Sequence, residues 1–113
     1  MLEKLEQFVL LHDIYGALLT DKQRRILKDY YENDFSLSEI ADDMNTSRQA
    51  VYDLIKRAEH QLMQYEAKLG LLDKLKTTRR QMETVCELLS QEEPDVERLL
   101  EARRILQETM ELL

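Results

Sequence analysis

Helix-breaking residues are nearly missing from this chain. Its 113 residues include two glycines and one proline, the two residue types that cost most inside a helix. Much of the remainder is Leu, Glu, Lys, Arg, Gln and Ala, which lose little on entering a helix. No run alternates β-branched or aromatic residues as a strand would. The sequence therefore predicts an all-α fold.

Apolar residues recur at helical spacing through residues 1–70 and predict a helical domain there. Its helices are expected at about residues 2–18, 21–32, 37–44 and 48–69. Thr20 precedes Gln23, and Ser36 precedes Glu39, at the three-residue spacing of a capping box, which marks the start of a helix. Gly70 is expected to end the fourth helix, because glycine accepts the left-handed backbone that closes many helices.

Beyond Gly70, apolar residues continue at steps of three and four, interrupted by a polar stretch at 90–95. Pro94 suits the first turn of a following helix. Two helices joined by a short loop form an antiparallel pair. Residues 71–113 are therefore predicted to form a C-terminal helical hairpin.

The predicted hairpin carries more apolar residues than one pair of helices can bury. These residues fall on more than one helical face and include Leu99, Leu100, Ile105 and Leu106. A second copy of the chain would bury the surplus through a two-fold interface. The sequence therefore predicts a homodimer through the hairpin.

The third and fourth expected helices have the spacing of a helix-turn-helix, which joins a short helix to a capped second helix through a tight turn. Ala41 is small enough to let the two helices cross closely, and Asn45 tolerates a sharp turn. The inward residues are expected to be Ile40, Ala41 and Met44 on the first helix, and Val51, Leu54 and Ile55 on the second.

In a helix-turn-helix, the start of the second helix enters the major groove. The outward residues expected to bind nucleic acid are Ser47, Arg48, Gln49, Tyr52, Lys56 and Arg57. Arg48 can bind guanine or phosphate, Gln49 can pair with adenine, and Tyr52 can stack or bond a phosphate. Ser47 would cap the second helix, whose first amides can hold a phosphate. Lys56 and Arg57 would contact the nucleic-acid backbone. Asp53 also faces outward and would repel phosphate.

The formal net charge of −7 limits this interpretation, because a phosphate backbone repels an acidic protein. Neither residues 1–70 nor residues 71–113 carry a net positive charge, so nucleic-acid contact depends on how charges are arranged on one face. A second interpretation therefore stays open. The chain would be a protein-interaction module that keeps the fold without contacting the groove, and the apolar stripe of its last helix would face a partner.

Several segments of the chain resemble known bacterial proteins. Residues 19–62 are similar to the region of primary sigma factors that reads the −35 promoter element. It resembles more closely the YlxM-like family (uncharacterised protein family 0122). The segments that carry the resemblance are residues 17–24, 30–31, 36–41 and 47–53.

The resemblance implies a cytoplasmic, regulatory accessory of the signal recognition particle pathway, with the outward residues above as its nucleic-acid surface. The mechanism it implies is binding to the particle RNA or to the particle GTPase. A DNA-binding transcription regulator is the other function that a sigma-like motif implies. The chain lacks the promoter-opening and polymerase-binding regions of a sigma factor.

Catalytic and membrane features are not found in the sequence. It has no glycine-rich phosphate loop, and His12 and His60 lack a metal-ligand partner at helical spacing, so no enzyme, cofactor, metal or small-molecule substrate is expected. No apolar run is long enough to span a membrane, and the first residues do not resemble a secretory signal. The expected location is the cytoplasm. The single cysteine, Cys86, is expected to be a small buried apolar residue.

Overall fold

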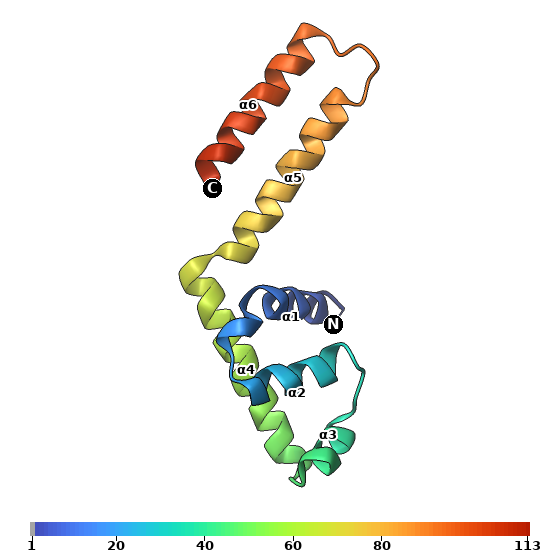
Figure 1. The fold of residues 1–113 in the computed structure, drawn as a ribbon, viewed down its shortest axis with the longest axis vertical. Coiled ribbons are helices and arrows are strands. Elements are labelled where there is room, and N and C mark those ends of the chain that lie inside the picture. Colours follow the sequence, from blue (N-terminus) through green and yellow to red (C-terminus); the bar gives the residue numbers. More distant parts are fainter. Residues whose placement is uncertain (1) are drawn as a thin grey trace. The chain divides into compact units, whose positions relative to one another are not determined.

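The structure is a computed structural model that describes residues 2–113, and all of its regular elements are helices (Figure 1). They are α1 (Leu2–Tyr15), the 3₁₀ turn η1 (Gly16–Leu18), α2 (Asp21–Tyr31), α3 (Leu37–Met44), α4 (Arg48–Leu69), α5 (Leu71–Leu89) and α6 (Val96–Leu112). The predicted all-α fold is confirmed. In the part of the chain that the structure describes, no helix has the length and apolar character needed to cross a membrane. The chain forms two compact units, the first ending at Gly70 and the second comprising Leu71–Leu113.

In the first unit, α4 is the longest helix, and α1, α2 and α3 each pack against it (Figure 1). A core of apolar side chains lies between the four helices. The largest fully buried side chains come from all four helices and are Leu11, Tyr15, Leu27, Ile40, Val51 and Leu62. Packing of one apolar stripe per helix supplies most of the stability of such short helices.

Both predicted capping boxes are present. The Thr20 hydroxyl accepts a hydrogen bond from the backbone amide of Gln23, whose side chain accepts from the Thr20 amide, both at 3.1 Å. Ser36 and Glu39 make the same reciprocal pair at the start of α3. Gly70 follows α4 with a φ of 62°, so it ends the helix in the left-handed conformation expected of it.

The first helix is shorter than the sequence predicts. It ends at Tyr15, and residues 16–18 form a 3₁₀ turn closed by a 3.1 Å hydrogen bond from the Leu19 amide to the Gly16 carbonyl. Glycine favours an early end because it is a poor helix former, and 3₁₀ turns are common at helix ends. Gly16 is buried beside the ring of His12, to which a Cβ would approach within 3.6 Å.

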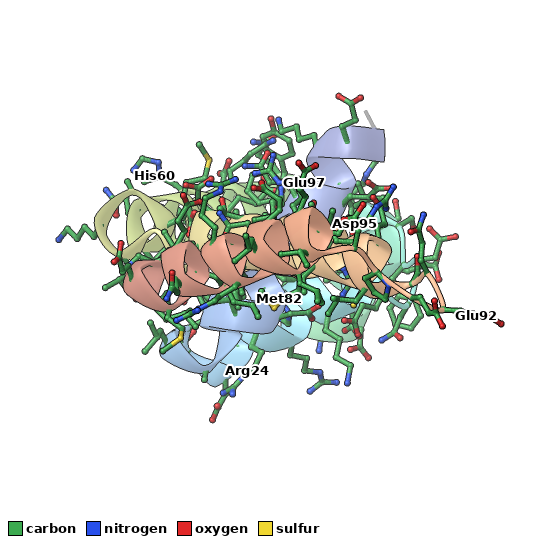
Figure 2. The ribbon with its side chains drawn as sticks, turned by 90° about the horizontal axis from the view of Figure 1, so that it is seen from above. Arg24, His60, Met82, Glu92, Asp95 and Glu97 are labelled. Atoms are coloured by element: carbon green, nitrogen blue, oxygen red, sulfur yellow. The ribbon has the colours of Figure 1, made fainter. Side chains whose placement is uncertain are left out.

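The second unit is a helical hairpin in which α5 and α6 run antiparallel (Figure 1). Its buried cluster consists of Val85, Ala102 and Ile105, flanked by the partly buried Met82 and Leu88. Figure 2 shows Asp95 and Glu97 at the start of α6. Asp95 is the N-cap and accepts a 2.9 Å hydrogen bond from the Arg98 amide. Pro94 therefore lies before the cap. The prediction that it occupies the first turn of the helix is wrong.

The predicted burial of Cys86 is wrong, because its side chain is exposed. Val85 occupies the position on α5 that packs against α6. Successive residues of an α-helix are rotated by about 100°, so Cys86 turns away from the contact. Apolar neighbours in sequence did not reveal which of the two adjacent residues faces the partner helix.

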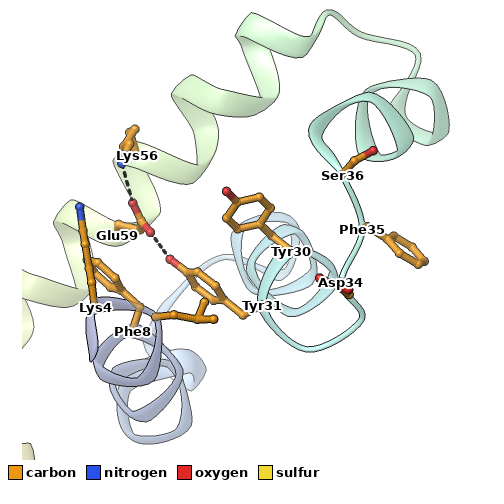
Figure 3. A pocket seen from close by; sticks show the side chains of 10 residues that line it. Lys4, Phe8, Tyr30, Tyr31, Asp34, Phe35, Ser36, Lys56 and Glu59 are labelled. Carbon is orange, nitrogen blue, oxygen red and sulfur yellow. Dashed lines mark hydrogen bonds and ion pairs between the residues drawn. The ribbon is translucent and has the colours of Figure 1, made fainter. Parts of the chain in front are cut away.

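A buried carboxylate links α2 to α4 in the first unit (Figure 3). Glu59 of α4 is 8% exposed. The Tyr31 hydroxyl donates a hydrogen bond to it, and Lys56 Nζ lies 3.4 Å from Glu59 Oε1. Burial, together with the hydrogen bond and negative charge of Glu59, raises the pKa of Tyr31 well above its ordinary value. The hydroxyl therefore stays protonated and keeps the carboxylate paired.

Replacing Tyr31 with Phe should destabilise the first unit by about 1–2 kcal/mol, because a buried carboxylate loses a hydrogen-bond donor. Urea unfolding followed by circular dichroism measures the change. Tyr30→Phe is the matched control, since no hydrogen bond of the Tyr30 hydroxyl occurs among the described residues. Equal unfolding midpoints for the two variants would contradict the structural role of the Tyr31–Glu59 bond.

The raised pKa of Tyr31 also predicts a pH dependence. The unfolded chain releases this proton at about pH 10, whereas the folded chain holds it to higher pH. The free energy of unfolding should therefore fall as the pH rises above about 10. The decrease in the free energy of unfolding with rising pH should be smaller in Tyr31→Phe than in the wild-type protein.

Candidate nucleic-acid interface

The turn between α3 and α4 is set by one residue in the left-handed conformation. Asn45 has φ 53° and ψ 48° and ends α3. The Thr46 amide donates a 3.0 Å hydrogen bond back to the Ala41 carbonyl, which tightens the turn. Ser47 then caps α4, its hydroxyl accepting a 3.1 Å hydrogen bond from the Ala50 amide. The chain thus passes from one helix to the next in three residues.

Packing between α3 and α4 fixes which side of α4 faces the protein. Of the expected inward residues, four are nearly fully buried and two, Met44 and Leu54, are partly buried. The buried four are Ile40, Ala41, Val51 and Ile55. Because Val51 and Ile55 lie one turn apart and point inward, the opposite side of α4 is left for solvent.

All six residues predicted to contact nucleic acid are exposed, and none lies on the packed face of α4. They are Ser47, Arg48, Gln49, Tyr52, Lys56 and Arg57, and we call them, with Asp53, the α4 ridge. Lys56 Nζ lies 5.4 Å from the centroid of the Tyr52 ring, within cation–π range. Within residues 2–113, neither Arg48 nor Arg57 forms an ion pair.

The structure divides the ridge between two shallow hollows. The first, of about 390 Å³, is lined by Arg48, Gln49 and Tyr52 together with Leu37 of α3. The second, of about 440 Å³, contains Lys56 and Arg57. Ser47 lines neither hollow and caps α4.

Hydrogen bonding within the ridge affects how it could read a base. Gln49 Nε2 donates to Asp53 Oδ1 at 3.0 Å. A bidentate pair with adenine requires the same amide nitrogen. Gln49 would therefore have to release Asp53 before it could pair with adenine. The same contact satisfies an oxygen of Asp53, which is the only acidic residue of the ridge as defined above.

Sequence reasoning missed the residues that complete the second hollow. These are Gln23 of α2 and His60, Gln61 and Gln64 of α4. Figure 2 shows the His60 side chain pointing outward from α4. Residues three and four apart share a helical face, so extending the ridge by one turn from Lys56 and Arg57 would have found His60.

Sequence spacing also missed one group of possible metal ligands. Atoms of His12, Asp13 and Glu32 lie within 4.8 Å of one another, and His12 Nε2 is buried without a hydrogen-bond partner among the described residues. Glu32 directly follows α2, so only the packing of α1 on α2 brings it near. Both carboxylates are exposed, unlike the enclosed four-ligand set of a structural zinc site.

Asn45 offers a direct test of the turn that orients the ridge. Asn45→Ala should destabilise the protein by about 1–2 kcal/mol, because a Cβ without a polar group disfavours the left-handed conformation. Asn45→Gly should keep wild-type stability, since glycine adopts that conformation freely. Thermal unfolding of the three proteins measures the difference. Equal losses in both variants would mean that the Asn45 side chain, not its backbone angle, matters.

A short helix, a three-residue turn with a left-handed residue and a capped long helix together define a helix-turn-helix protein. A sequence model of the family UPF0122, described as "Putative helix-turn-helix protein, YlxM / p13 like", matches residues 2–102. The chain belongs to this family, and the resemblance expected from its sequence is confirmed.

Several curated UPF0122 proteins are similar to the chain. One from Caldanaerobacter subterraneus subsp. tengcongensis is 52% identical over 80 residues, covering 71% of this chain and 68% of the relative. One from Bacillus mycoides is 50% identical over 93 residues, covering 82% and 84%. One from a Thermoanaerobacter species is 44% identical over 106 residues, covering 91% of each.

Proposed function

We propose that this protein is a nucleic-acid-binding accessory of the signal recognition particle pathway, contacting the particle RNA or DNA through the α4 ridge. The observation that carries the proposal is the pair of cations Arg48 and Arg57. Each is exposed, and neither is paired with an acidic residue among those described. Membership of a helix-turn-helix family supports nucleic-acid contact. The pathway itself is proposed from the family resemblance.

Phosphate binding would begin at the first turn of α4. The backbone amides of Arg48 and Gln49 occupy the first two helical positions, which lack acceptors within the helix. Such amides and the positive end of the helix dipole favour a phosphate. The Arg48 guanidinium extends from the same turn, and Arg57 follows nine residues, about two and a half turns, further on. Because the whole chain is acidic, binding should be local and strongly salt-dependent.

Removing the two unpaired arginines of the α4 ridge should weaken nucleic-acid binding without disturbing the fold. For Arg48→Ala plus Arg57→Ala we expect at least about a tenfold loss of affinity, and a salt slope smaller by about two. Fluorescence anisotropy with labelled RNA and DNA duplexes over a salt series measures both quantities. Lys56 is left intact because it pairs with the buried Glu59.

The matched control is Lys74→Ala plus Lys76→Ala, which removes the same charge from exposed positions of α5. It should bind like the wild-type protein. If both double variants lose affinity equally, the effect comes from net charge and the α4 ridge is not the contact surface. If the wild-type protein binds neither duplex at near-physiological salt, the nucleic-acid function is wrong.

A protein-interaction role is the second candidate, and exposed apolar residues of α6 favour it. Met110 is 74% exposed and Val96 69% exposed, and the net charge of −7 disfavours non-specific binding to nucleic acid. In this role the protein would bind the particle GTPase without touching RNA. A sigma-like DNA-binding regulator is the remaining alternative. All of these roles are binding roles in the cytoplasm, and none requires catalysis or a cofactor.

A pull-down of the particle GTPase from lysate, with and without nuclease treatment, separates the first two candidates. Loss of the GTPase after nuclease treatment is expected if RNA bridges the two proteins. A GTPase signal that survives nuclease treatment would replace the RNA contact with direct protein binding. The Arg48→Ala plus Arg57→Ala variant should lose only an RNA-dependent signal.

Homodimer formation through the α5–α6 hairpin is part of the proposal. The hairpin has 43 residues, and its cluster of buried apolar side chains has three members. Units of about 40 residues usually need a metal, a disulfide or a second subunit to be stable. A second copy would supply the missing burial and would give each assembly two α4 ridges.

A further inference from the structure

α6 has two apolar faces, and α5 covers one of them. The covered face contains Ala102, Ile105 and Thr109, all buried. The Thr109 hydroxyl donates to the Ile105 carbonyl at 2.8 Å and forms a second hydrogen bond with Gln81 of α5. The second face lies on another side of the helix, and its residues are solvent-exposed.

The exposed face is a continuous seam with heptad spacing. The steps between its six residues are alternately three and four residues long, which is the spacing of the a and d positions of a coiled coil. They are Val96, Leu99, Arg103, Leu106, Met110 and Leu113, and we call them the α6 seam. Its apolar members are between 40% and 80% exposed. Five large apolar side chains in line form the kind of patch that marks an interaction site.

The order of the seam is the same from either end of the helix. Steps of three, four, three, four and three separate its residues in both directions. An identical helix running antiparallel therefore brings Val96 opposite Leu113 of the partner subunit and Leu99 opposite Met110 of the partner subunit. Arg103 then lies opposite Leu106 of the partner subunit, and its aliphatic stem can cover apolar surface while the guanidinium reaches water.

A parallel arrangement is disfavoured by the only charged member of the seam. In a parallel, in-register pair, Arg103 would face its own copy in the centre of the contact. Two guanidinium groups at one core position repel each other and lose hydration. The antiparallel arrangement offsets the two copies of Arg103 by three residues, about 4.5 Å, along the helix. Each then faces Leu106 of the partner subunit and not its own copy, so the seam is complementary to itself in one orientation.

We propose that α6 packs against α6 of a second copy of this chain, antiparallel, about a two-fold axis between Arg103 and Leu106. This inference rests on the homodimer proposed above and specifies its helix, orientation and register. The interface is continuous along the whole helix, because the seam begins at Val96, the first residue of α6, and extends to Leu113.

Charged substitutions in the seam test which helix forms the interface. Leu99→Asp and Met110→Asp should each convert a dimer into a monomer at micromolar concentration, measured by light scattering or sedimentation. Leu75→Asp is the matched control, because Leu75 is an exposed leucine of α5, 53% exposed, outside the seam. It should stay dimeric.

Disulfide trapping tests the orientation, in a Cys86→Ser background that removes the exposed native thiol. Leu99→Cys plus Met110→Cys should form a covalent dimer under mild oxidation. Neither single variant should do so, because the two copies of one position are 11 residues apart along the antiparallel axis. That separation is about 16 Å, beyond the roughly 4–7 Å that a disulfide spans between Cα atoms.

Each outcome has a defined meaning. If the wild-type protein has the mass of a single chain, the homodimer and this inference are both wrong. A dimer in which the single variant Leu99→Cys cross-links to itself keeps the homodimer but overturns the antiparallel arrangement. A dimer that survives Leu99→Asp and traps no disulfide overturns the α6 seam as its interface. Anisotropy with nucleic acid is measured separately, so failure of the α4 ridge is distinguishable from all three.

Discussion

The first unit depends on burial of one face of α4. Val51, Ile55, Ala58 and Leu62 follow one another at helical spacing and are each 3% exposed or less. They form the surface on which the three preceding helices pack. Complete burial of one such side chain contributes about 1.5–3 kcal/mol. Since the face that packs is fixed by this burial, the opposite face is fixed as the exposed one, and the candidate interface follows from core packing.

Some of the charges on this protein form local pairs. Arg25 pairs with Asp43 across helices, and other arginines, such as Arg79 and Arg104, pair with acids one turn away. Exposed pairs of this kind add little stability. Arg48 and Arg57 have no such partner among the described residues. Two acids of α4 are engaged elsewhere, because Asp53 accepts from Gln49, and Glu59 accepts from Tyr31 and pairs with Lys56. An acidic chain can thus present two unpaired arginines on one helix.

Local signals predicted the helix starts and the turn well. Thr20, Ser36, Asn45 and Ser47 act through bonds or backbone angles within three or four residues of themselves, so their roles can be read from neighbouring positions. α1 ends at Tyr15, whereas the sequence predicted an end at about residue 18. The effect of Gly16 was missed because it depends on the adjacent turn. Cys86 was misplaced because two adjacent residues on α5 were equally apolar, and only the packing of α6 distinguishes them.

The sequence by itself determined the helical class, the family and the exposed residues of α4, because propensity, capping and periodicity act over short stretches of chain. Tertiary structure alone decided that Glu59 would be buried against Tyr31, that Glu32 would approach His12, and that Val85, not Cys86, would face α6. These contacts join residues distant in sequence, or depend on which helical face a partner helix covers. Their geometry exists only once the helices have packed, so no local pattern encodes it.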